Sequence, residues 1–172
     1  MASVNMSEWD EAVVIALGSN LKGPWASTRE LLEAALARFR PEGLDVVRQS
    51  SWWRSAAWPD PDEPPFLNAV VIVKTEMDAH ETMAALSRIE EAFGRDRHRL
   101  NAPRTLDLDL IAYGRIVDHD TGLTLPHPRA RQRRFVMGPL AEIAPGWVCP
   151  ETGERAGVLV ERCEVGLDAR PI

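Results

Sequence analysis

Segments with strand periodicity alternate with segments of helical periodicity along this sequence, and their order limits the folds open to it. Four runs predict strands, because their apolar residues are continuous or alternate: 12–17, 44–53, 66–75 and 106–113. Two segments predict helices, because apolar residues recur every three or four positions: 27–39 and 79–93. The order β-α-β-β-α-β is that of the ferredoxin-like fold. We therefore expect an α+β protein with an antiparallel sheet, both helices on one face, and a C-terminal extension that holds a further helix at 135–143.

The length of 172 residues fits one domain, since domains commonly span about 100–200 residues. We expect a core over about 12–148, with 1–11 and 150–172 peripheral. The first ten residues contain acids and lack the apolar centre of a signal peptide, and no apolar run is long enough to span a bilayer. Cys149 and Cys163 lack CxxC spacing. These features predict a cytoplasmic protein with two unpaired thiols.

The sharpest local pattern is the strand LDLDLIAY, in which two acids alternate with leucines. Asp107 and Asp109 are two residues apart, so they point to the same face of a strand, while the leucines point to the other. Neighbouring carboxylates repel each other unless a cation lies between them, and hard oxygen ligands of this kind suit Mg²⁺. A solvated strand face, with the acids paired to arginines, is the alternative explanation.

Arginines gather on both sides of this acid pair. One cluster precedes the pair and the other follows it: Arg95, Arg97, Arg99, Arg104, Arg129, Arg131, Arg133 and Arg134. The net charge of -6 excludes a polyanion-binding protein by bulk charge, so an anionic ligand must be met locally. Guanidinium groups bind phosphate oxygens in pairs. Each arginine alone could form a surface salt bridge, but together with two metal-binding acids they predict a phosphoryl-transfer site. The sequence contains no GxxxxGKS or GxxxxGKT loop and no GxGxxG.

Six motifs now stand in a recognisable order: ALGSN, FLN, IEEAFGRDR, PRTLDLDLIAY, LPHPR and RRFVMGPLAEIAP. In this series the chain resembles the hydroxymethyl-dihydropterin pyrophosphokinases of the folate pathway, over roughly 12–148. The resemblance implies a ferredoxin-like fold and transfer of pyrophosphate from Mg-ATP to the hydroxymethyl group of 6-hydroxymethyl-7,8-dihydropterin, giving AMP and the pterin diphosphate. It also implies that the partners are these small molecules, with no nucleic acid, membrane or obligate protein partner.

The resemblance assigns residues to an ATP side and a pterin side of one site. It implies that Asp107 and Asp109 hold two Mg²⁺ ions, and that Arg95 and Arg104 act in catalysis from the ends of a mobile loop. The implied contacts to ATP are Arg95, Arg97, Arg104, Ile111, Thr124, His127 and Arg133, with Glu90 nearby. The implied contacts to the pterin are Gly18, Ser55, Trp58, Phe66, Asn68 and Phe135.

Several of these residues also have an ordinary structural explanation. Phe66 and Phe135 could be core residues, His127 could belong to a surface turn, and Gly18 could relieve a turn. Asn68 is harder to explain in this way, because a buried amide is costly unless it is hydrogen-bonded. Two other functions stay open at this point. One is a pterin-binding relative without turnover. The other is a non-catalytic nucleotide- or RNA-binding module, which would need exposed aromatic residues on the central strands in a basic setting.

Overall fold

The structure, a computed structural model, describes residues 9–57, 60–94, 105–120 and 122–172. Its strands are β1 (Val13–Ser19), β2 (Asp45–Gln49), β3 (Trp53–Ser55), β4 (Phe66–Lys74), β5 (Asp107–Tyr113) and β6 (Arg170–Pro171). Its α-helices are α1 (Thr28–Ala37), α2 (Ala79–Ala92), α3 (Arg134–Ile143) and α4 (Ala156–Leu159). The strands pair antiparallel in the order β5-β1-β4-β3-β6, and β2 also pairs with β4. The predicted α+β fold with an antiparallel sheet is confirmed.

The strand predicted over 44–53 is two strands, and this part of the prediction is wrong. Gln49 lies opposite Val71 and Trp53 lies opposite Asn68, so the three residues 50–52 face only two residues of β4. Ser50 sits in this irregularity, where its backbone N–H donates to the Val70 carbonyl and its hydroxyl accepts from the Val70 N–H. The extra residue acts as a bulge that breaks the ladder. Nothing in the apolar pattern marks it.

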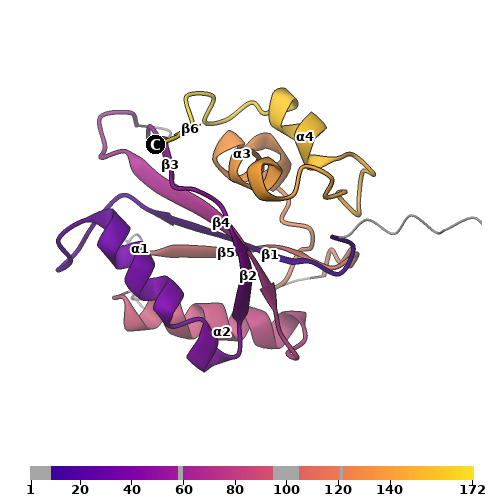
Figure 1. Cartoon of the computed structure of the whole chain (residues 1–172), viewed down its shortest axis with the longest axis horizontal. Coiled ribbons are helices and arrows are strands. Elements are labelled where there is room, and N and C mark those ends of the chain that lie inside the picture. The colour runs from indigo at the N-terminus through magenta and orange to yellow at the C-terminus, as the bar shows by residue number, and fades with distance from the viewer. Residues whose placement is uncertain (1–8, 58–59, 95–104, 121) are drawn as a thin grey trace, which may run out of the picture.

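Helices α1 and α2 cover one face of the sheet, below it in Figure 1. Their N-termini are capped by side chains: Ser27 accepts from the Glu30 N–H and Asp78 accepts from the Glu81 N–H. Between these helices and the sheet lies a continuous core to which strands and helices both contribute. Its fully buried members include Ile15, Leu31, Leu32, Phe39, Ala69, Val71, Leu86, Ile89 and Leu106.

A second core covers the opposite face, under α3 and α4 (Figure 1). Strand residues Val14 and Val70 pack there against Met137 and Leu140 of α3. Residues 150–172, beyond the core range expected from the sequence, add Ala156, Leu159 and Cys163 to this cluster. Strands β1 and β4 are therefore buried on both faces, as their continuous apolar runs indicate. This arrangement removes the exposed central strands that an RNA-binding module would need.

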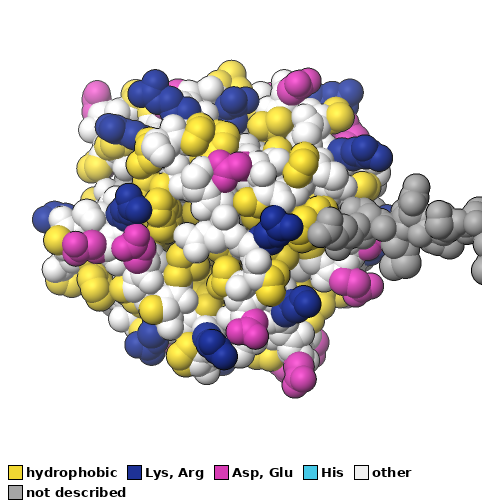
Figure 2. All heavy atoms as spheres, viewed as in Figure 1, with side chains coloured by type: hydrophobic (Ala, Val, Ile, Leu, Met, Phe, Trp, Pro, Cys, Tyr) yellow, Lys and Arg dark blue, Asp and Glu magenta, His cyan; other side chains and the backbone are white. Residues whose placement is uncertain are grey.

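The outer surface of the molecule is mixed in charge. Figure 2 shows acidic and basic side chains interspersed over one face, with small apolar areas between them. Within the described parts of the chain, no helix combines the length and apolar character that crossing a membrane requires.

Candidate active site

A cavity of about 200 Å³ opens where the second core ends, between the sheet and the start of α3. Its walls come from β1, β3, β4, β5, α3 and the C-terminal segment. The lining residues are Ala16, Leu17, Gly18, Ser55, Ala56, Phe66, Asn68, Asp107, Asp109, Arg133, Phe135, Val136 and Val165. Strand register explains the grouping, since Gly18 of β1 lies opposite Asn68 on one side and Asp107 on the other.

The acid pair occupies the floor of the cavity at the start of β5. Asp107 and Asp109 are half-buried and line the cavity, whereas Leu106, Leu108 and Leu110 are buried in the opposite core. The predicted division of this strand into a polar face and an apolar face is therefore present. Two carboxylates beside a cavity are a donor set that fits Mg²⁺, which commonly takes one or two protein acids and completes its shell with water and phosphate. In the described ranges no group of three or more His, Cys, Asp and Glu side chains is placed to hold a metal.

Glu90 of α2 contacts β5, the strand that carries the acid pair, from the face covered by α1 and α2. Its side chain is buried, and its carboxylate accepts a hydrogen bond from the Leu108 N–H at 3.1 Å. Leu108 lies between the two aspartates. Glu90 thus fixes the backbone of β5 from the helix-covered face, where it does not reach the cavity lining.

Asn68 and Gly18 form the central wall. The buried Asn68 donates from Nδ2 to the Ser55 hydroxyl at 3.0 Å, which sets the orientation of its amide. A Cβ on Gly18 would lie 3.0 Å from Asn68 Oδ1. Gly18 is inside β1 and not in a turn, so the turn explanation for it is wrong. The glycine permits the close approach of the amide instead.

Two aromatic residues, from β4 and α3, line the cavity. Phe66 and Phe135 are both half-buried and line it, so neither is a simple core residue. The Arg133 guanidinium lies 5.7 Å from the centre of the Phe135 ring, within reach of a cation–π interaction. Val136 and Val165 also line the cavity, although the sequence analysis assigns neither to the site. Val136 lies inside the motif RRFVMGPLAEIAP, whereas Val165 lies outside all six motifs.

A second hollow, of about 280 Å³, adjoins the first and shares Asp109 with it. Thr124 and His127 line it, together with Met83, Leu110, Gly122, Leu123 and Pro128. Ile111 does not join them, because its side chain is buried in the second core. Its carbonyl instead accepts the His127 N–H at 2.8 Å and so positions the histidine backbone.

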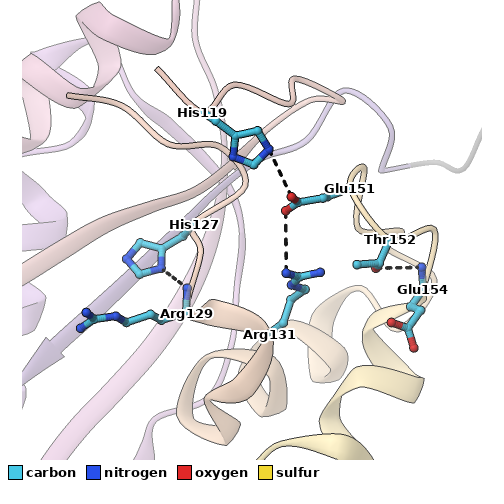
Figure 3. Close-up of polar contacts among 7 residues, drawn as sticks. All are labelled: His119, His127, Arg129, Arg131, Glu151, Thr152 and Glu154. Carbon is cyan, nitrogen blue, oxygen red and sulfur yellow. Dashed lines mark hydrogen bonds and ion pairs between the residues drawn. The ribbon is translucent and has the colours of Figure 1, made fainter. Parts of the chain in front are cut away.

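His127 is held as a neutral donor. Its Nδ1 accepts the Arg129 N–H at 3.2 Å, so a neutral ring carries its hydrogen on Nε2 (Figure 3). Burial lowers the pKa of His127; Asp109 opposes this shift, and Arg133 and Arg129 add to it. The effect of Asp109 also places His127 in the field of this carboxylate. At neutral pH the ring can donate one hydrogen bond from Nε2.

The arginines that follow the acid pair do not all belong to the site; some of them make structural contacts elsewhere. Only Arg133 of this cluster lines either hollow. Arg131 pairs with Glu151 at 3.8 Å, where His119 also contacts the carboxylate (Figure 3). Arg134 donates from Nε to the Ala169 carbonyl. Four residues assigned to the site by resemblance lie outside the described ranges: Trp58, Arg95, Arg97 and Arg104.

A family model and two relatives that are similar in sequence point to the same protein family. A sequence model of 7,8-dihydro-6-hydroxymethylpterin-pyrophosphokinase (HPPK) matches residues 14–145. The chain is 39% identical over 168 residues to the 2-amino-4-hydroxy-6-hydroxymethyldihydropteridine pyrophosphokinase of Synechocystis, covering 95% of this chain and 84% of that one. It is 40% identical over 134 residues to the protein of the same name from Methylorubrum extorquens, covering 78% and 83%.

A solved structure supports the fold independently. Plasmodium falciparum HPPK-DHPS superposes with a TM-score of 0.68 at 11% identity, over 88% of this chain. This chain spans 44% of that longer protein, so the likeness concerns the fold alone. The sequence match and the relatives carry the functional conclusion: the chain belongs to the 7,8-dihydro-6-hydroxymethylpterin-pyrophosphokinase family and is a pyrophosphokinase of folate biosynthesis.

Proposed function

We propose that the chain binds 6-hydroxymethyl-7,8-dihydropterin in the cavity beside Asn68 and the triphosphate of Mg-ATP in the hollow beside His127, and joins them by pyrophosphate transfer. The observation that carries this assignment is Asp109, which lines both spaces. A hydroxyl in one space and a phosphate in the other would meet at this carboxylate.

The cavity suits a pterin chemically. A pterin is a flat heterocycle with amide-like edges, so it needs aromatic contacts on its faces and donors and acceptors in its plane. Phe66 and Phe135 supply aromatic surface, and the amide of Asn68 supplies the in-plane contact. Because Ser55 holds the amide in one orientation, Asn68 presents a fixed pattern of donor and acceptor.

The acid pair suits two Mg²⁺ ions, with Asp107 and Asp109 as the protein ligands. Bound Mg²⁺ would neutralise phosphate charge and lower the pKa of a coordinated hydroxyl. The chain's own contribution is to place charge around the phosphates: Arg133 brings a permanent positive charge, and His127 donates from Nε2. We assign Arg95 and Arg104 to charge that develops during transfer, and Arg97 to ATP binding.

Attack on the β-phosphorus of ATP distinguishes this reaction from ordinary phosphoryl transfer. The test is to incubate the chain with Mg-ATP and the dihydropterin alcohol and to follow both nucleotides and pterins by chromatography. We expect AMP and the pterin diphosphate in equal amounts. Formation of ADP would contradict the proposed chemistry, and binding of both substrates without any product would identify a relative that has lost turnover.

We assign this activity to a single domain spanning 1–172 and to the cytoplasm. Cys149 and Cys163 are both free and buried, which suits a reducing compartment. Limited proteolysis of the purified chain, and cell fractionation with an antibody, would test these two statements.

A further inference from the structure

We propose that the C-terminal segment 164–169 is a positioning element that fixes two walls of the pterin cavity through Gly166 and Asp168. This inference rests on the proposed function of that cavity. The segment lies beyond residue 145, where the family match ends. Its contacts reach both the start of α3 and the end of β3.

The first set of contacts ties the segment to the start of α3. The N–H groups of Glu164 and Val165 both donate to the Gln132 carbonyl at 2.9 Å, and the Val165 carbonyl accepts the Arg134 N–H at 2.9 Å. These bonds flank Arg133 on both sides. The Val165 side chain meanwhile lines the cavity. The segment therefore fixes the backbone from which Arg133 and Phe135 project.

Gly166 sets the position of the Phe135 ring. A Cβ built on Gly166 would lie 2.5 Å from Phe135 Cδ1 and 3.1 Å from Cε1, closer than packed carbon atoms approach. Gly166 also has a φ of +70°, in the left-handed region that favours glycine. The ring rests against the bare backbone of the segment, so any side chain at 166 would push the ring toward the cavity.

Asp168 ties the same segment to the opposite wall. Its carboxylate accepts the Ala56 N–H at 2.7 Å, and Ala56 itself lines the cavity. Ala56 directly follows Ser55, the residue that orients the Asn68 amide. The buried Ala169 next to it accepts a hydrogen bond from Arg134. A short stretch of chain thus connects the aromatic wall to the wall that reads the pterin edge.

The first test compares two glycines of the tail. Gly153 has a φ of +74° and open space where a Cβ would be, so Gly153→Ala introduces backbone strain without a clash. We expect Gly166→Ala to raise the KM for the dihydropterin about tenfold, with the KM for ATP unchanged, because the ring is displaced. Gly153→Ala should leave both constants unchanged. Equal KM values in the two variants would overturn the role of Gly166.

The link to Phe135 is tested by a double variant. If Gly166 acts through the ring, Gly166→Ala should have no further effect on the dihydropterin KM in a Phe135→Ala background. Additive effects would show that Gly166 acts by another route and would overturn the proposal. Melting temperatures of all variants separate folding defects from changes in binding.

Asp168 supplies a second test, which holds even if Gly166→Ala does not fold. Asp168→Ala should raise the dihydropterin KM about fivefold while kcat and the KM for ATP stay near the unchanged protein, because one hydrogen bond to Ala56 is lost. Asp168→Asn keeps an acceptor oxygen and should restore most of the affinity. A fall in kcat with unchanged KM would contradict positioning. Activity of the unchanged protein tests the proposed function separately, since only the variants bear on the tail.

Discussion

The two faces of the sheet are built from the same strands but are closed in different ways. Below the sheet, α1 and α2 have side-chain caps and cover a core in which the strand residues are apolar from end to end. Above it, α3 begins without a side-chain cap at Arg133, and the second core stops short of the strand ends. The cavity lies where that second core stops.

Strand β5 contributes to both the closed core on one face and the cavity on the other, within a few residues. Leu108 is buried in the closed core, while Asp107 and Asp109 on either side of it line the cavity. The pleat of one strand therefore separates a residue that stabilises the fold from two that serve the site. It follows that substitutions on the two faces should affect different measurements.

The largest effect is expected from the acids of the open face. Asp107→Asn or Asp109→Asn should lower kcat by at least about a thousandfold, because each removes a metal ligand and a charge at almost constant volume. The melting temperature should stay close to that of the unchanged protein. Asp45→Asn, on the exposed strand β2, is the matched control and should keep full activity. Near-normal turnover of either site variant at saturating Mg²⁺ would remove the acid pair from the mechanism.

On the closed face the effect should fall on stability instead. Leu86 of α2 is 1% exposed in the closed core, so Leu86→Ala should lower the free energy of unfolding by about 2–5 kcal/mol. The folded fraction should keep its KM values for both substrates. Urea unfolding with Val46→Ala as control, at an exposed position, measures the difference. A selective loss of substrate affinity in Leu86→Ala would show that the two faces are coupled.

An intermediate effect is expected at Asn68, where the open face meets β4. Asn68→Leu keeps the volume but leaves the pterin edge unpaired, and should weaken dihydropterin binding about 10- to 100-fold with ATP binding unchanged. Separate titrations of each ligand by calorimetry test this, with Gln49→Leu on exposed β2 as control. Equal losses for both ligands would make Asn68 a structural residue.

The smallest effect concerns the titration of His127. Because Asp109 raises the pKa of His127 and Arg133 lowers it, Asp109→Asn should lower this pKa further and Arg133→Leu should raise it. The lowered pKa also means that the unfolded chain binds a proton first as the pH falls below the ordinary value of 6.5, so His127 makes the fold less stable in acid. Imidazole resonances followed by NMR measure each shift. Shifts in the opposite directions would place His127 outside this charge cluster.

The sequence predicts the fold well because its periodicity follows burial directly. The continuous run of β1 reports a strand covered on both faces, and the alternation in β5 reports a strand with one polar side. The break at Ser50 has no such signature, because it depends on a hydroxyl replacing a backbone partner in the ladder. Interruptions of this kind arise from tertiary pairing and not from local composition.

Some residues of the site can likewise be predicted from the sequence, and others cannot. The acid pair, the clustered arginines and Asn68 can be recognised in the sequence. Clustered charges, and an amide inside an apolar strand, are costly unless they are paired with a partner or a ligand. The resemblance assigns Ile111 to ATP binding, yet its side chain is buried and its carbonyl accepts the His127 N–H. Val165 and Gly166 cannot be found from pattern, because their importance comes from contacts about thirty positions earlier in the chain: Val165 bonds to Gln132 and Arg134, and Gly166 lies against Phe135.

The position of Val165 has a practical consequence for inhibitor design. The acids and Asn68 belong to the span matched by the family, so a compound that contacts only them stays within that span. Val165 lines the same cavity from outside that span. A pterin analogue extended toward this side chain would contact a surface that the shared motifs do not dictate. Such an analogue would combine contacts inside the matched span with one contact outside it.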